Sequence, residues 1–303
     1  MKLEFNNPWT VEGVWLKGNL HAHTDRSDGM LTVEEVIEAY RGRGYRFLSI
    51  TDHGMLTYPD EKPRDILLIP GEEISVGTSS AGTRFHILTI NVEEELPVEE
   101  GDPDESPQRV IDLTLRYGGI PIVAHPYWSG FNLQDLMSLK NYIGIEIYNT
   151  TCELNRQRGL STVHWDGLLS NGWRLYGFAG DDAHMERRPG LPPDIGGAWI
   201  MVKAEEPTVE AVVDAISRGL FYSSNGPEIR GLDIGEGVIH VETSPVRWIS
   251  FVSNPTLGLR YTAERGEITE AEFRVTGDET YIRIEVSDIY GRKAWTNPIY
   301  VEA

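Results

Sequence analysis

Residues 18–29 of the chain read Gly18-Asn19-Leu20-His21-Ala22-His23-Thr24-Asp25-Arg26-Ser27-Asp28-Gly29. His21 and His23 end an apolar, β-type run that starts at residue 14, and side chains two apart on a strand face the same side. Both imidazoles can therefore reach one metal ion, and imidazole suits zinc, manganese and iron. Thr32 and Glu35 follow with a capping-box pattern, which predicts that a helix begins there. The segment thus predicts a strand, a metal-binding turn and a helix in succession.

The same alternation of β-type and helix-type patterns continues along the chain. We expect strands at residues 14–21, 46–51, 66–74, 85–91, 120–124, 144–148 and 174–179. Helix patterns occupy residues 32–43, 106–117, 132–139, 154–170 and 208–218. Strands that alternate with helices favour parallel βα units, and about seven such units favour a barrel over an open sheet. In barrels of this kind the chemistry lies at the carboxyl ends of the strands.

Six of the eight histidines lie at or within the ends of these strands, each beside other metal-type ligands. The segments are His21-Ala22-His23, Thr51-Asp52-His53, Pro70-Gly71-Glu72-Glu73, His86, Ala124-His125-Pro126 and Gly180-Asp181-Asp182-Ala183-His184. A single buried histidine is more often a core residue than a ligand, and Asp52 and Asp181 are open to interpretation as helix N-caps. Six histidines at successive strand ends would be a large coincidence, so the set as a whole favours a metal centre.

These motifs resemble those of the PHP (polymerase and histidinol phosphatase) family of metal-dependent phosphoesterases. The family's opening signature corresponds to residues 18–29, and its later signatures correspond to Thr51-Asp52-His53, Gly71-Glu72-Glu73-Ile74-Ser75, His86, Ala124-His125-Pro126 and Asp182-Ala183-His184. The resemblance covers residues 14–225. It implies an α/β fold, namely a distorted (βα)7 barrel, that holds two or three divalent ions of zinc, manganese or iron.

The resemblance also implies which residues bind the ions. One ion would bind His21, His23, Glu73 and Asp182; a second would share Glu73 and bind His86 and His125; a third would bind Asp28, His53 and His184. Glu72 adjoins the bridging position, but Glu73 matches the family's Gly-x-Glu pattern. Asp28 stands where some members have histidine, which would weaken or alter the third site.

From about residue 229 the pattern changes to short β-type runs without helix patterns between them, at residues 239–243, 248–253, 272–275, 281–286 and 294–301. Turn signals such as Gly235-Glu236-Gly237 separate these runs, and the spacing predicts a small antiparallel β-sandwich. We therefore expect a PHP barrel at residues 1–228 and a β-sandwich domain at residues 229–303. This domain order, with the junction at residues 219–227, is similar to the carbaryl-hydrolase-like branch of the family.

The composition disfavours several classes of protein. Lys and Arg number 27 against 47 Asp and Glu, a net charge of −20 that disfavours nucleic acid and anionic membranes as partners. The single cysteine, Cys152, excludes an internal disulfide and a cysteine-rich zinc site. No apolar run reaches the ~18 residues of a membrane span, and the N-terminus has no signal-like core. We expect a cytoplasmic protein that acts on a small molecule, with its oligomeric state open.

These features predict a metal-dependent hydrolase in which a metal-bridging hydroxide attacks a small phosphate ester. Glu73 and Asp182 are the predicted catalytic carboxylates. Arg26 and Arg187 are the predicted substrate-binding residues, because arginine holds phosphate by paired hydrogen bonds, although solvated loop charges are an equal interpretation. Cys152 is interpreted as a pocket wall. Two alternatives stay open: a carbamate or carboxyl ester hydrolase on the same metals, and a catalytically silent metal-binding interaction module.

Overall fold

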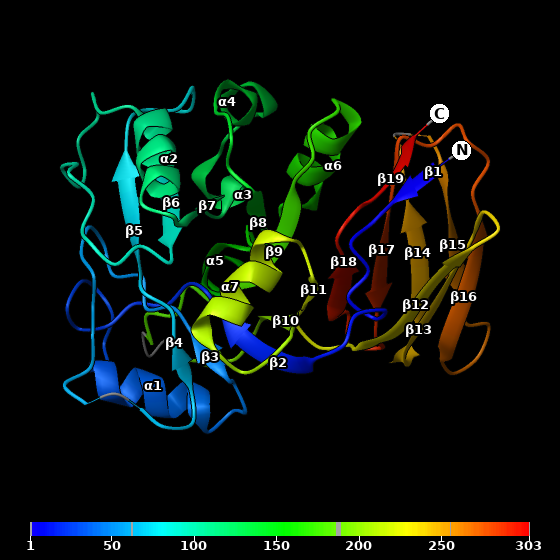
Figure 1. The fold of residues 1–303 in the computed structure, drawn as a ribbon, viewed down its shortest axis with the longest axis horizontal. Coiled ribbons are helices and arrows are strands. Elements are labelled where there is room, and N and C mark those ends of the chain that lie inside the picture. The colour runs from blue at the N-terminus through cyan, green and yellow to red at the C-terminus, as the bar shows by residue number, and fades with distance from the viewer. Residues whose placement is uncertain (1, 62, 186–188, 255, 303) are drawn as a thin grey trace.

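The computed structural model describes residues 2–61, 63–185, 189–254 and 256–302 (Figure 1). The expected mixed α/β architecture is confirmed, with strands arranged in sheets of 11, 5 and 3 strands. Helices cover the outer side of the N-terminal part, and the C-terminal part is built from strands. Among the described residues, no helix is both long and apolar enough to cross a membrane.

The five-stranded sheet forms one wall of the N-terminal part. Its order is β5 (Gly71–Val76), β6 (Phe85–Ile90), β7 (Ile120–Val123), β8 (Gly144–Asn149) and β9 (Tyr176–Gly180). β7, β8 and β9 run parallel as expected, whereas β5–β6 and β6–β7 are antiparallel. Only residues 77–84 connect β5 to β6, and a parallel pair needs a crossover of about a dozen residues or more.

The opposite wall belongs to the 11-stranded sheet. There β2 (Val14–Asn19), β3 (Phe47–Leu48) and β4 (Leu67–Leu68) are parallel, and β10 (Trp199–Ala204) pairs antiparallel with both β2 and β11 (Phe221–Ser224). The expected closed (βα)7 ring of strands is not found among the described residues. Two isolated bridges, Ala22 to Ala183 and His53 to Glu73, join the two walls instead, so the walls meet among the predicted ligands.

Four of the five predicted helices are found close to their expected bounds: α1 (Val33–Arg41), α2 (Pro107–Arg116), α4 (Leu133–Ser138) and α7 (Val209–Ser217). The predicted capping box of Thr32 and Glu35 is present at α1. The single helix expected at residues 154–170 was wrong, because the chain forms α5 (Thr150–Arg156) and α6 (Thr162–Ser170). Gln157 ends α5 in the left-handed conformation, at φ 56°. The short α3 (Pro126–Ser129) had no sequence signal.

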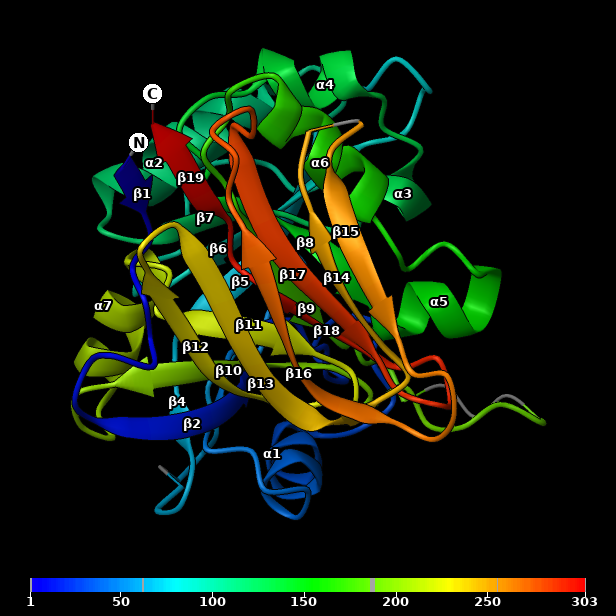
Figure 2. The same ribbon diagram turned by 90° about the vertical axis from the view of Figure 1, so that its right-hand side faces the viewer.

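The C-terminal part consists of two antiparallel layers, as Figure 2 shows. The outer layer contains β12 (Ile229–Gly235), β13 (Val238–Val246) and β16 (Ile268–Arg274). The inner layer contains β14 (Trp248–Val252), β15 (Gly258–Thr262), β17 (Tyr281–Ser287), β18 (Lys293–Thr296) and β19 (Ile299–Glu302). Buried apolar residues such as Val241, Phe251 and Ile284 fill the space between the layers.

Hydrogen-bonded strands continue across the predicted domain boundary at residue 228, which itself stays a prediction. β18 pairs antiparallel with β11, and the N-terminal strand β1 (Lys2–Glu4) pairs with β19. The two chain ends therefore lie side by side (Figure 1). The rings of Trp9 and Trp15 pack against that of Tyr222, at centroid distances of 5.8 and 5.7 Å. The N-terminal segment thus contributes to the core of the C-terminal part.

Candidate metal centre

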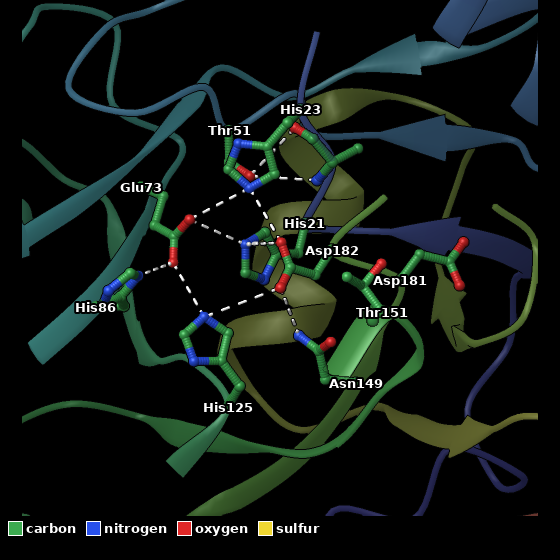
Figure 3. Close-up of polar contacts among 12 residues, drawn as sticks. His21, His23, Thr51, Glu73, His86, His125, Asn149, Thr151, Asp181 and Asp182 are labelled. Carbon is green, nitrogen blue, oxygen red and sulfur yellow. Dashed lines mark hydrogen bonds and ion pairs between the residues drawn. The ribbon is translucent and has the colours of Figure 1, made fainter. Parts of the chain in front are cut away.

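Glu73 lies at the centre of a ring of imidazoles (Figure 3). Its side chain points inward from β5 and is 1% exposed. Its Oε2 atom lies 3.2 Å from Nε2 of His21 and 3.2 Å from Nε2 of His23. Its Oε1 atom lies 2.8 Å from Nδ1 of His86 and 3.2 Å from Nε2 of His125. Oε2 also lies 3.5 Å from Nδ1 of His53, so the two oxygens of one carboxylate face different sets of histidines.

All nine residues predicted as ligands come together in three adjoining groups. These are His21, His23, Glu73 and Asp182; Glu73, His86 and His125; and His23, Asp28, His53 and His184. The grouping matches the expectation, except that His23 also joins the third group. Glu72 points to the other side of β5, where its Oε1 accepts the Leu96 N–H at 3.2 Å. The choice between the two neighbouring glutamates therefore falls on Glu73.

The buried nitrogens of these histidines fit divalent metal ions. Neither ring nitrogen of His23 forms a hydrogen bond with any described residue, and both are inaccessible to solvent. Its Nε2 lies 3.1 Å from Asp182 Oδ1, at an angle that makes no hydrogen bond. Buried polar atoms without partners are rare and cost roughly 1–3 kcal/mol each. An ion between these atoms would satisfy them, and a set of imidazole and carboxylate ligands suits zinc, manganese or iron.

The charges in the site are strongly coupled. Burial by itself would lower the pKa of His184, but Asp28 and Asp182 outweigh it and raise the pKa to about 10. Burial would also lower the pKa of His53, but Asp28, Glu73 and Glu100 outweigh it and raise the pKa to about 9. Burial would raise the pKa of Glu73, but the neighbouring histidines hold it well below its usual range. Cations that bind here therefore displace protons from the imidazoles.

Two of the candidate ligands have an unusual backbone conformation. His125 follows β7 at φ 28° and ψ 59°, and Asp182 follows β9 at φ 53°. Residues other than glycine rarely adopt positive φ, and the strain costs on the order of 1–3 kcal/mol each. Such strain persists where the surrounding structure fixes the chain, and here it turns both side chains toward Glu73 (Figure 3).

Glu146 on β8 orients ligands from behind the site. Its Oε1 lies 2.8 Å from Nδ1 of His21, which leaves Nε2 of that ring to face Glu73. Its Oε2 accepts the backbone N–H of His125 and the side-chain amide of Asn149, both at 2.9 Å. That amide also donates to Asp182 at 3.2 Å (Figure 3). One buried carboxylate thus positions members of two ligand groups.

We expect Glu146→Gln to weaken Mn²⁺ binding about 10- to 100-fold, the usual effect of losing a carboxylate that orients a ligand histidine. Calorimetric titration with Mn²⁺ measures the affinity, and excess metal should restore most of the lost activity. Glu153→Gln is a matched control, because that carboxylate accepts the Gly159 N–H at 3.0 Å and contacts no candidate ligand. A lower melting temperature with unchanged Mn²⁺ affinity would show that Glu146 stabilises the fold but does not orient the ligands.

Asp52 and Asp181 do not act as N-caps of any described helix. Asp52 accepts the N–H of Thr24 at 2.7 Å and its hydroxyl at 2.6 Å. Asp181 accepts the N–H groups of Gly196 and Ala198 at 2.6 and 2.7 Å, and burial raises its pKa to about 6. Both carboxylates hold loops that flank the ligand groups.

A cavity of about 250 Å³ opens over the ligands. The ligand side of its wall contains Asp28, His53, Glu73, His86, His125, Asp182 and His184. The other lining residues are Trp128 of α3 and Thr151, Cys152, Asn155 and Arg156 of α5. Burial and Asp182 raise the pKa of the Cys152 thiol, so it lacks thiolate character and acts as a wall residue.

The predicted substrate-binding arginines are not placed in this cavity. Arg26 is exposed and is not among the described residues that line it. Arg187 lies outside the described residues. Arg156, which had no sequence signal, is the arginine that the described lining contains. The roles of Arg26 and Arg187 stay predictions.

Sequence patterns missed Glu146 and Asn149. Glu146 stands inside the apolar run Gly144-Ile145-Glu146-Ile147, and a charged residue within a fully buried strand is a usable signal. Asn149 had no such signal, because asparagine at a strand end is common in turns. The two histidines outside the strand-end segments, His164 and His240, are not part of the three groups.

No known family model matches the chain, and no curated protein matches it. Solved structures that match the chain include the following three, each with a TM-score below 0.5. A two-domain protein from Bacteroides vulgatus that contains a predicted PHP-like metal-dependent phosphoesterase is 16% identical, with 90% of this chain and 91% of that chain covered and a TM-score of 0.48. An amidohydrolase from Chromobacterium violaceum with bound sulfate and no metal is 17% identical, with 58% and 92% covered and a TM-score of 0.40.

The third is from Bifidobacterium adolescentis, and its metal-dependent phosphoesterase activity is itself only proposed. It is 15% identical, with 69% of this chain and 98% of that chain covered and a TM-score of 0.45. At these identities the function has to be inferred from the geometry of the site.

Proposed function

We propose that the protein is a metal-dependent hydrolase of the PHP kind and that it acts on a small phosphate ester. The observation that carries this proposal is the position of Glu73 at the base of the cavity. Its two oxygens face different ligand groups, so it would help to hold metal in both of them. Bound divalent ions would supply Lewis acidity and activate water as a nucleophile at neutral pH.

The charge balance of the site favours phosphate over a carbamate or carboxyl ester. Three carboxylates, Asp28, Glu73 and Asp182, belong to the ligand groups. Two or three divalent ions would exceed that negative charge and make the base of the cavity positive. Arg156 adds a positive side chain to the wall. A phosphate dianion gains from this field, whereas a neutral carbamate gains little. The chain as a whole carries a net charge of −20, so local positive charge is what would draw an anion to the site.

The protein's own side chains prepare the site for substrate. Glu146 orients the ring of His21, and the backbone carbonyl of Asp182 accepts a hydrogen bond from His184 Nδ1 at 2.7 Å. His125 Nδ1 lies 3.1 Å from Ser129 Oγ. Each of these contacts leaves Nε2 free for the ligand group. We assign Arg156 and Asn155 to bind the phosphoryl oxygens, because they line the same cavity as the candidate ligands.

Paired hydrolysis rates with one chromophore test this proposal. We expect the Mn²⁺- or Zn²⁺-loaded protein to release 4-nitrophenol from 4-nitrophenyl phosphate faster than from a 4-nitrophenyl carbamate. The doubly substituted Asp182→Asn, His184→Ala protein is the blank, because it lacks ligands from the first and third groups. Release from the carbamate alone would contradict the proposal and would show that the site hydrolyses carbonyl compounds instead. Metal binding without release from either ester would support a silent binding module.

A further inference from the structure

A second, larger cavity adjoins the one over the ligand groups and shares lining residues with it. The outer cavity has a volume of about 620 Å³, and its lining includes Ser75, Thr78, Gly82, Thr83, Arg84, Glu100, Gly101 and Pro103. Three side chains line both cavities: His53, His86 and Trp128. Two of these belong to candidate ligand groups. A molecule whose reacting atom lies over Glu73 can therefore extend past the ligands into the outer cavity.

Trp128 forms the boundary between the two cavities and is held in a fixed orientation. Its ring packs edge-on against His125 at a centroid distance of 5.0 Å and against His86 at 5.9 Å. The side chain is still 41% exposed. An indole that is fixed by its neighbours and partly open to a cavity offers a flat apolar surface. It suits a flat, unsaturated group placed next to the ligands.

The turn between β5 and β6 forms one wall of the outer cavity and is held by hydrogen bonds. The N–H of Ser79 donates to the carbonyl of Thr83 at 2.8 Å, and the Thr83 hydroxyl donates to the carbonyl of Ser129 at 2.6 Å. The turn is also anchored through Ser80 to Asp135 on α4, at 2.9 Å. These contacts hold the backbone that carries Arg84 in place relative to α3 and Trp128.

Arg84 is the charged group of this wall that is available to a ligand. Its side chain is exposed and forms no hydrogen bond or ion pair with a described residue. Glu100, which lines the same cavity, is already engaged, since its carboxylate accepts the Ser75 N–H at 2.8 Å and lies 3.9 Å from His53 Nδ1. In a chain of net charge −20, a free arginine facing a cavity marks a place for an anion.

We propose that the outer cavity binds the leaving group of the substrate, and that this group is a flat ring with an anionic substituent. The ring would lie on Trp128 and the anion would pair with Arg84, while the phosphoryl group lies over Glu73. This inference rests on the proposed phosphoesterase function. In the reaction the bond between phosphorus and the ester oxygen attached to the ring breaks, and the oxygen of water forms the new bond to phosphorus. The leaving group takes a proton from that water and departs as a phenol or alcohol.

The test compares two aryl phosphates that differ in charge at one position. With the Mn²⁺-loaded protein, kcat/KM is measured for 4-carboxyphenyl phosphate and 4-carbamoylphenyl phosphate. We expect the carboxylate to be preferred by about tenfold, the effect of one charge-assisted hydrogen bond. Arg84→Gln should reduce this preference at least fivefold. Arg265→Gln, which removes an exposed arginine from the C-terminal part, should keep the wild-type preference.

Binding of the two products separates this inference from the proposed function. Calorimetry would compare 4-hydroxybenzoate with 4-hydroxybenzamide on the wild-type and Arg84→Gln proteins. Equal rates and equal affinities for the charged and neutral forms would overturn the leaving-group subsite while leaving the phosphoesterase proposal intact. If neither ester is hydrolysed but the carboxylate still binds more tightly through Arg84, the phosphoesterase proposal fails and the subsite stands.

Discussion

Replacing Glu73 by glutamine is expected to lower kcat/KM by at least about 10³-fold, on the order of 4 kcal/mol of transition-state stabilisation. Its Oε2 faces His21 and His23 while its Oε1 faces His86 and His125. Glutamine offers only one acceptor oxygen, and its amide nitrogen cannot bind a cation. The variant therefore cannot bridge two ligand groups. Elemental analysis should show fewer bound metal ions per chain than in the wild type.

The neighbouring residue provides a matched control for this experiment. Glu72 is also buried on β5, but its carboxylate accepts the Leu96 N–H on the opposite side of the strand. Glutamine can accept the same hydrogen bond, so we expect Glu72→Gln to leave activity and metal content close to those of the wild type. If Glu72→Gln were inactive and Glu73→Gln active, the bridging position would have to move to Glu72.

The control also has a predictable dependence on pH. Burial raises the pKa of Glu72 from 4.5 to about 7, because water no longer stabilises the carboxylate. Its contribution to stability is therefore fully present below about pH 4.5 and is lost as the pH rises through about 7. Glutamine stays neutral throughout. The melting temperature of Glu72→Gln minus that of the wild type at the same pH should therefore be larger at pH 8 than at pH 5.

The second large effect is expected at the contact between α6 and β17. Arg283 is 2% exposed, and its Nε and Nη2 each donate to Asp166 at 2.7 Å, while Nη1 donates to Glu285 at 3.0 Å. Its guanidinium also lies 5.2 Å from the ring of Trp165. We expect Arg283→Met to cost about 3 kcal/mol of unfolding free energy, because Asp166 loses both hydrogen bonds from the guanidinium and the buried Glu285 keeps only Lys293, at 2.6 Å. Denaturant titration of the metal-free protein measures the loss.

A second arginine supplies the comparison for this prediction. Arg174 lies just before β9 and pairs with Glu4 of β1 at 2.8 Å and with Glu302 of β19 at 3.3 Å, but all three side chains are largely exposed. Arg174→Gln should therefore have a much smaller effect, since water and salt screen exposed pairs. Combining Arg283→Met with Asp166→Asn should recover part of the stability. A loss at Arg174 as large as that at Arg283 would show that burial does not set the strength of these contacts.

The local sequence did not predict which arginines line the cavities. Arg26 was singled out because it lies inside the first motif, yet its side chain is exposed and is not part of the described cavity lining. Arg156 and Arg84 face the cavities from a helix and a turn that have no metal-type motif of their own. Long side chains reach their partners across elements that are distant in the sequence, so spacing along the chain does not predict which arginine meets a ligand.

The strand connections show a similar limit. The alternation of patterns predicted parallel units and one closed ring, but the short connection at residues 77–84 makes β5 and β6 antiparallel. The walls meet through the single bridges of Ala22 with Ala183 and of His53 with Glu73 rather than through a full ladder. Hydrophobic periodicity reports which side of a strand is buried, but it does not report which strand lies beside it.

By itself, the sequence predicted the mixed α/β class, the β-rich C-terminal part and nine candidate ligands, which the structure brings together in three adjoining groups. It did so because alternation, capping and ligand chemistry are local properties, carried by short segments such as residues 18–29. Only the tertiary structure decided which oxygen of Glu73 faces which histidines, that Glu146 supports them, and that a second cavity with Arg84 adjoins the first. These features depend on contacts between residues far apart in the chain, and such contacts form only when the sheets pack together.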